Sequence, residues 1–164
     1  MNGKTDDSMY FSFKRGTTFN AELSCLGFFP AYSGNSGHNR NNPDAVSTPE
    51  VGPLPPGLYY IVTRPRGGLA THWHDVIKEF ESGSNRDFWF ALYRHDNHID
   101  DTTFINRVER GSFRLHPAGQ SGISNGCITL PNHAHFRILM HGLLASGTIK
   151  VAAGLNALGT IQVY

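Results

Sequence analysis

The chain has 164 residues, which is enough for one domain with a sizeable hydrophobic core. Lys and Arg total 14 while Asp and Glu total 13, so the formal net charge of +1 excludes a basic surface for nucleic acid and an acidic tail. The first residues lack a signal-peptide pattern, and no apolar stretch is long enough for membrane insertion. We therefore expect a protein that is made in the cytoplasm and exported only by a signal-independent machine.

Short apolar runs separated by turn residues predict strands along most of the chain. With 18 glycines and 9 prolines, the composition favours short strands and many turns over long helices. Alternation of apolar and polar residues within several runs is typical of half-buried strands. The predicted strands are residues 9–15, 21–29, 58–62, 87–94, 112–116, 127–130, 148–154 and 160–164.

The remaining segments predict one long loop and two short helices. Residues 32–57 are rich in Gly, Asn, Ser and Pro, and we interpret them as a long surface loop rather than an interdomain linker. Apolar residues at helical spacing predict a helix over residues 74–82 and another that begins after Asn132, its expected cap. The apolar positions of the second helix are Phe136, Leu139, Met140 and Leu143. The sequence therefore predicts a mainly β domain with two short helices.

One thiol and one imidazole are predicted to meet in the last third of the chain. Alternation in residues 112–116 places Arg114 and His116 on the face opposite the core. The chain then turns through residues 117–126, and a hairpin-like return would bring Cys127 beside His116. A thiol becomes a good nucleophile when a neighbouring base removes its proton, and an imidazole can do so.

The residues before the cysteine also suit acyl transfer. Gly126 would let a substrate approach the backbone closely, and the N–H groups of Gly126 and Cys127 would face a developing oxyanion. The alternative is a structural cysteine in a buried strand, with His116 on the surface. The sequence Ser124-Asn125-Gly126 in front of the cysteine counts against that alternative. This pattern predicts acyl transfer through a thioester.

At these residues the chain resembles a known family. The stretch "HPAGQSGISNGC" is similar to the His…Ser-x-Gly-Cys signature of L,D-transpeptidase catalytic domains. With "FRLHPAG", "SNGCITL", "YSGNSG", "NNP" and "GPLPPGLYYIV", the chain resembles the type VI secretion L,D-transpeptidase effector family. The resemblance runs from about Tyr32 to Leu130. It implies a single catalytic domain over residues 1–164 with an L,D-transpeptidase-like β-sandwich.

The resemblance also implies roles for individual residues. The family's nucleophile falls on Cys127 and its general base on His116, while Ser124 and Gly126 take the motif's serine and glycine positions; we place Ser124 among the substrate-binding residues. Housekeeping L,D-transpeptidases usually carry arginine two residues after the cysteine, where this chain has Thr129. The His-to-Cys gap is also shorter here. Both departures favour the effector branch over a cross-linking role.

The substrate implied by the resemblance is the tetrapeptide stem of peptidoglycan. The family cleaves between the L-centre of meso-diaminopimelate and D-alanine, and it exchanges that D-alanine for another D-amino acid. No metal or organic cofactor is implied. The expected partners are the stems, a cognate immunity protein and type VI secretion components, and the expected site of action is the periplasm of target bacteria.

Other polar residues are candidates for substrate binding or for orienting His116. Arg114 would clamp the terminal carboxylate of the substrate, or it is a solvated strand residue. Tyr32, Ser33 and Asn35 are predicted to line the cleft. The residue that orients His116 stays open. The candidates are Asp96, Asp100, Asp101 and a backbone carbonyl.

Two further segments contain residues that could form a site. Cys25 has apolar neighbours and is interpreted as a packing residue. His72, His74 and Asp75 include a His-x-His pair that can bind zinc, but a third ligand at a known spacing is lacking. The start of a helix explains the stretch as well.

Two competing functions remain. One is a papain-like or related cell-wall cysteine amidase or endopeptidase, in which the cysteine usually precedes the histidine and opens a helix; here the order is reversed. The other is a non-catalytic wall-binding module with the same fold. The presence of His116, Gly126 and Cys127 argues against the latter.

Overall fold

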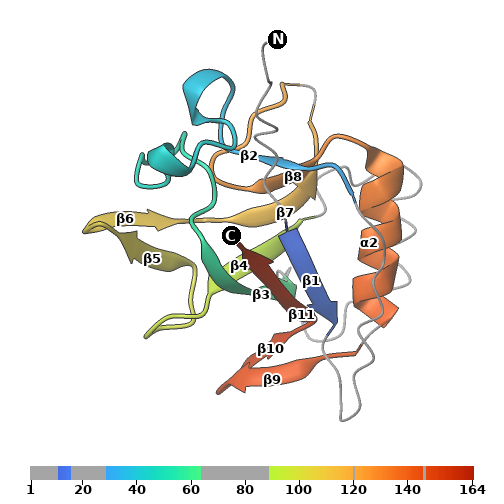
Figure 1. Ribbon diagram of the computed structural model, residues 1–164. Helices are drawn as coiled ribbons and strands as arrows, with labels where there is room; N and C mark the ends of the chain where they lie inside the picture. The colour runs from blue at the N-terminus through green and yellow to red at the C-terminus, as the bar shows by residue number, and fades with distance from the viewer. Residues whose placement is uncertain (1–10, 16–28, 64–88, 120, 146) are drawn as a thin grey trace.

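The computed structural model describes residues 11–15, 29–63, 89–119, 121–145 and 147–164, and within these it is mainly β (Figure 1). Seven strands form one sheet in the order β1-β11-β3-β4-β7-β8-β2, and β5-β6 and β9-β10 form two separate hairpins. The strands are β1 Phe11–Arg15, β2 Tyr32–Ser33, β3 Gly57–Thr63, β4 Phe90–Arg94, β5 Thr102–Ile105, β6 Val108–Gly111, β7 Arg114–Pro117, β8 Ile128–Leu130, β9 Ile149–Ala152, β10 Leu155–Ala157 and β11 Gly159–Val163. The mainly β prediction is confirmed.

The helix α2, His133–Ala145, runs alongside the sheet (Figure 1). Its predicted cap is confirmed, because the Asn132 side chain accepts hydrogen bonds from the backbone N–H of Ala134 at 2.8 Å and of His135 at 3.3 Å. The apolar face of α2 is buried in the main core with Ile61, Phe90 and Leu115 of the sheet. The predicted helix at 74–82 and strand at 21–29 lie outside the described residues, apart from Phe29.

The return of the chain after β7 differs from the prediction. Strands β7 and β8 pair in parallel, with His116 opposite Thr129 and Leu115 opposite Ile128, so the predicted hairpin-like return is wrong. Parallel neighbours need a crossover, which the segment after β7 supplies before β8 enters the sheet between β7 and β2. Cys127 directly precedes β8, and continuing this register places it beside Arg114 of β7, two residues before His116.

The predicted surface loop over residues 32–57 is partly buried. It contains β2 and two 3-10 helices, Gly37–Asn39 and Pro43–Ala45, and Leu54 within it is fully buried in the main core. The buried guanidinium of Arg110 donates hydrogen bonds to the carbonyls of Val46, of Gly52 at 3.0 Å and of Pro53 at 3.3 Å. These bonds fasten the loop to β6, which explains how so polar a segment packs against the sheet.

Candidate active site

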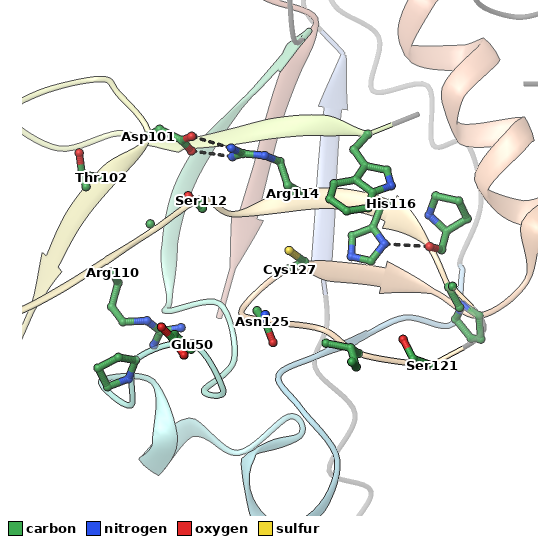
Figure 2. Close-up of a pocket in the computed structure, with 18 of the residues that line it drawn as sticks. Glu50, Asp101, Thr102, Arg110, Ser112, Arg114, His116, Ser121, Asn125 and Cys127 are labelled. Carbon is green, nitrogen blue, oxygen red and sulfur yellow. Dashed lines mark hydrogen bonds and ion pairs between the residues drawn. The ribbon is translucent and has the colours of Figure 1, made fainter. Parts of the chain in front are cut away.

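His116 and Cys127 line one open pocket of about 1460 Å³ (Figure 2). Strand β7 supplies Arg114 and His116 to its wall, and the residue just before β8 supplies Cys127. Trp89 and Asp101 line the same wall. The predicted alternation is confirmed here, because Phe113 and Leu115 point into the core while Arg114 and His116 face the pocket.

The imidazole of His116 is held on three sides. Its side chain is buried, with the residue 6 % exposed, and Nδ1 lies 2.8 Å from the Pro117 carbonyl oxygen. A carbonyl only accepts, so Nδ1 carries a proton and Nε2 is left with a lone pair. Nε2 lies 3.2 Å from the Thr129 hydroxyl, which therefore donates to it. The Trp89 ring stacks on the imidazole at a centroid separation of 4.9 Å and a tilt of 34°.

Burial lowers the pKa of His116 below its ordinary value, and the hydrogen bond to Pro117 opposes the shift. The imidazole is therefore neutral at pH 7, the state that can accept a proton. The open question of its orienting group is answered by the backbone carbonyl of Pro117.

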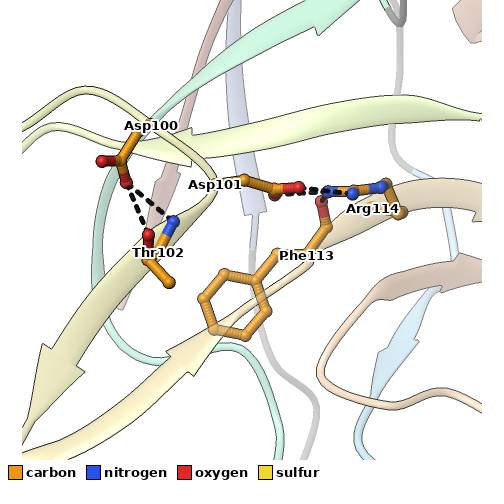
Figure 3. Close-up of polar contacts among 5 residues, drawn as sticks. All are labelled: Asp100, Asp101, Thr102, Phe113 and Arg114. Atoms are coloured by element: carbon orange, nitrogen blue, oxygen red, sulfur yellow. Dashed lines mark hydrogen bonds and ion pairs between the residues drawn. The ribbon is translucent and has the colours of Figure 1, made fainter.

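The three carboxylates considered for that role are engaged elsewhere. Asp96 accepts a 2.6 Å hydrogen bond from the Thr103 hydroxyl. Asp100 accepts from the backbone N–H and the hydroxyl of Thr102, at 2.8 and 3.0 Å. Asp101 forms an ion pair with an arginine of β7 (Figure 3). Each of these contacts fixes the turn that leads from β4 into β5.

The thiol of Cys127 is buried and protonated at rest. The residue is 7 % exposed, and burial raises the pKa of its thiol to about 11, although the backbone hydrogen bond and the positive charge of Arg114 oppose the rise. Among the described residues, no hydrogen bond joins this thiol to the imidazole of His116. The resting site thus combines a neutral thiol and a neutral imidazole that face one pocket.

Arg114 makes a two-point contact with the carboxylate of Asp101, through two hydrogen bonds of 2.6 Å (Figure 3). It also donates to the Phe113 carbonyl at 2.7 Å. The arginine side chain is 11 % exposed and that of Asp101 is 38 % exposed. The expected clamp on a substrate carboxylate stays a prediction. It would require the substrate to replace Asp101 or to bind beside the pair.

Ser124 and Gly126 shape the turn before the cysteine. The buried Ser124 hydroxyl donates to the Cys127 carbonyl at 2.8 Å, and the Gly126 N–H donates to the Ser124 carbonyl at 2.9 Å. The Gly126 N–H is therefore engaged within the turn, and its role in an oxyanion hole stays a prediction. Ser124 does not line the pocket; it holds the turn that presents the thiol.

Tyr32, Ser33 and Asn35 do not line the pocket either; Tyr32 and Asn35 hydrogen-bond to the segment between β7 and β8, whereas Ser33 hydrogen-bonds within the 32–57 segment. The Asn35 side chain accepts from the Ser124 N–H at 2.9 Å and donates to the Asn125 side chain at 2.8 Å. The Tyr32 hydroxyl donates to the Gly122 carbonyl at 3.2 Å. The fully buried Ser33 hydroxyl accepts from the Leu54 N–H at 2.7 Å.

Position 126 accepts only glycine. Gly126 has a φ of +80°, in the left-handed region. An added Cβ would lie 2.8 Å from a guanidinium nitrogen of Arg110 and 2.9 Å from the Phe113 ring. Both neighbours are buried, and the guanidinium of Arg110 is tied to backbone carbonyls of the 32–57 segment. The glycine before the cysteine is therefore required by close packing as well as by its backbone conformation.

Replacing Gly126 with Ala is expected to lower the free energy of unfolding by roughly 2–4 kcal/mol, through backbone strain and overpacking. The matched control is Gly154→Ala, because Gly154 has a similar φ of +74° but open space around its missing Cβ. It should lose only about 1 kcal/mol, the cost of the left-handed conformation. Denaturant unfolding of both variants measures the difference, and equal losses would show that the contacts with Arg110 and Phe113 do not matter.

Two residues of the site were not predicted for it from the sequence. Trp89 falls in a strongly aromatic run, which predicts only a strand. For Thr129 the sequence indicates only a departure from housekeeping L,D-transpeptidases and predicts no role. Its spacing of two residues from Cys127 was the available signal, because positions i and i+2 of an extended segment share a face.

The described segments carry neither a metal-binding cluster nor a membrane-spanning helix. They contain no group of three or more His, Cys, Asp or Glu residues placed to hold a metal ion. No helix in them is long and apolar enough to cross a membrane. Cys25, His72, His74 and Asp75 lie outside the described residues.

Comparison with known proteins identifies the family of this site. The family model described as the Tlde1 domain matches residues 27–154, which include β7, the crossover and β8. No curated protein and no solved structure matches the chain. The match spans more than half of the sequence and contains the whole pocket wall formed by Trp89, His116 and Cys127. The chain therefore belongs to the Tlde1 domain family, the type VI secretion L,D-transpeptidase effectors.

Proposed function

We propose that this protein is an antibacterial effector that acts in the periplasm on tetrapeptide stems of peptidoglycan, through a thioester at Cys127. It would cleave the bond between meso-diaminopimelate and D-alanine, and it would exchange that D-alanine for another D-amino acid. The observation that carries the proposal is the pocket shared by His116 and Cys127, in which Nε2 of the imidazole is an acceptor. Family membership supplies the reaction class.

The proposed reaction has two halves. In the first, Cys127 Sγ attacks the diaminopimelyl carbonyl carbon while its proton passes to Nε2 of His116. The C–N bond then breaks, and Nε2–H protonates the amine of the departing D-alanine. In the second half, water or the amine of another D-amino acid attacks the thioester and gives a proton to Nε2. The thiolate leaves and recovers that proton, which restores the resting site.

The electrostatics favour proton transfer during attack over a preformed thiolate. With a thiol pKa of about 11, only about one thiol in ten thousand is ionised at pH 7. The neutral imidazole of His116 is the nearby base that can take the proton as the new C–S bond forms. The positive charge of Arg114 lowers the thiol pKa and would stabilise negative charge on the sulfur, whereas Asp101 opposes this effect.

Strand placement favours this reaction over a papain-like peptidase. Cys127 is followed by a strand, β8, and not by a helix, and His116 precedes it on the neighbouring strand β7. A wall-binding module would need neither a neutral buried imidazole nor a thiol in its pocket. Exporting the protein to the periplasm and testing its toxicity, as described next, distinguishes such a module from an enzyme.

Toxicity should depend on the compartment, because the stems lie outside the cytoplasmic membrane. Expressed in the cytoplasm of a bacterium, the protein should be harmless. Fused to an export signal, it should cause swelling and lysis, with tetrapeptide stems falling and tripeptide or exchanged stems rising. A cognate immunity protein in the producing cell would be needed to block this effect.

The exported Cys127→Ala variant is the control and should be harmless, because it cannot form a thioester. Full toxicity of that variant, or equal toxicity of the cytoplasmic form, would contradict the proposal and indicate another target.

A further inference from the structure

Thr129 is a buried polar residue at the centre of the proposed chemistry. It is fully buried between Ile128 and Leu130 in β8, and it is the register partner of His116 on β7. A buried hydroxyl needs a hydrogen-bond partner, and that of Thr129 lies 3.2 Å from Nε2 of His116. The contact therefore links the only polar side chain of β8 to the ring that faces Cys127 in the pocket.

The contact involves the nitrogen that would receive the thiol proton. Nδ1 of His116 is committed to the Pro117 carbonyl in both charge states, since it carries a hydrogen in each. Nε2 is the nitrogen that gains and loses a proton during turnover. A hydroxyl can donate to neutral Nε2 and, after rotation, accept from Nε2–H. Valine, its isostere, can do neither.

We propose that Thr129 is a positioning residue for His116, whose hydroxyl keeps Nε2 hydrogen-bonded in both protonation states of the cycle. The inference rests on the proposed function, in which His116 exchanges a proton with Cys127. Because the hydrogen bond to the charged imidazolium is the stronger of the two, the hydroxyl favours the protonated ring. It thereby offsets part of the lowering of the His116 pKa that burial causes.

Strand formation alone gives no reason for a hydroxyl at this position. Valine favours strands as much as threonine does, and it buries no polar group. The two neighbours in β8 are aliphatic and fully or almost fully buried. A purely structural residue here would be aliphatic too.

Other charged and titratable groups also line the pocket. They are Glu109 and Arg110 of β6, Arg114 of β7, Cys127, Asp101 before β5 and His133 of α2. Glu50 lines it from the 32–57 segment. Arg114 pairs with Asp101, and His133 Nε2 lies 2.8 Å from the Ala118 carbonyl oxygen. Among the described residues, only Thr129 hydrogen-bonds to Nε2 of His116.

The test compares Thr129→Val and Thr129→Ser with the wild type, using the full-length protein. Ring NMR, assigned through a His116→Gln variant, measures the His116 pKa without substrate, and tetrapeptide turnover is measured across pH. Thr129→Val should lower the His116 pKa, move the acidic limb of the turnover profile to lower pH and reduce kcat roughly tenfold. Thr129→Ser should stay within about twofold of the wild type, because it keeps the hydroxyl.

Thr103→Val is the matched control. It removes another buried threonine hydroxyl, which donates to Asp96 and lies outside the pocket, so it should cost stability while leaving the His116 pKa unchanged. An unchanged His116 pKa in Thr129→Val, or equal impairment of the Ser and Val variants, would overturn the proposal. If the Val variant does not fold, Thr129→Ala is the second hydroxyl-free variant. If the stems are not substrates, the proposed function fails, while the NMR titration still decides the role of Thr129.

Discussion

Replacing Cys127 with Ala is expected to abolish turnover of peptidoglycan stems, because the thioester cannot form without the sulfur. The loss should be complete and not partial, since Asp101, Arg114 and His116 offer no other nucleophile of comparable strength at neutral pH. The fold should survive, because removing one buried sulfur leaves only a small cavity, at a cost of about 1–2 kcal/mol. The test is the rate of D-alanine release, measured with equal amounts of folded wild-type and Cys127→Ala protein.

Cys25 provides the comparison for that variant. We expect Cys25→Ala to retain substantial activity and to lose mainly stability, as its apolar sequence neighbours indicate packing. Iodoacetamide labelling with and without the stem substrate, followed by peptide mapping, should then show that the substrate protects the thiol at position 127. Loss of turnover in a folded Cys25→Ala variant, with turnover retained in Cys127→Ala, would mean that the nucleophile has been misassigned.

Replacing His116 with Ala is expected to reduce turnover at neutral pH by about a hundredfold or more, the usual contribution of a general base. Folding must be verified separately, because the substitution also removes the partner of the Thr129 hydroxyl and the ring that stacks on Trp89. Alkylation of Cys127 should slow as well, because His116 no longer accepts the thiol proton as the new C–S bond forms.

The direction of the pH dependence follows from the pKa values. His116 acts as a base when neutral, so activity should rise with pH through the His116 pKa. Burial lowers that pKa, and the acidic limb should therefore lie below about 6.5, the ordinary value. The limb should vanish in His116→Ala, whose residual rate should instead increase toward the thiol pKa of about 11. An unchanged limb in this variant, or an unchanged alkylation rate, would show that His116 does not activate the thiol.

The face of β7 that carries the site could be predicted from its sequence, whereas the direction of β8 could not. Alternation correctly separates Phe113 and Leu115 in the core from Arg114 and His116 in the pocket, because the side-chain period of a strand is two. The same short apolar run suits a parallel or an antiparallel neighbour. The direction of β8 depends on the crossover and on the position of β8 beside β2, which tertiary structure determines and the local sequence does not.

Local chemistry also explains which smaller elements were predictable. The Asn132 cap satisfies N–H groups of the same helix, so its signal is local. The hairpin β5-β6 was not predicted, although Asn106 and Arg107 at its turn have φ values of 52° and 68°, typical of a type I′ turn. Asparagine was a usable signal there, whereas arginine is uncommon in that conformation.

The polar partners within the site were the least predictable part. Nothing near Arg114 in the sequence indicates that Asp101, thirteen residues earlier, occupies its guanidinium. The burial of the 32–57 segment likewise depends on Arg110, which reaches its carbonyls from β6. These contacts join segments that are distant in sequence, and they arise only once the sheet has formed.

The most direct measurement is mass spectrometry of purified disaccharide tetrapeptides incubated with the wild-type protein, with and without an added D-amino acid such as D-methionine. We expect disaccharide tripeptide and free D-alanine without the additive, and a tetrapeptide that carries D-methionine at its terminus with it. Both products should require Cys127. Unchanged stems with a folded protein, or cleavage at any bond other than the one between meso-diaminopimelate and D-alanine, would contradict acyl transfer at this site.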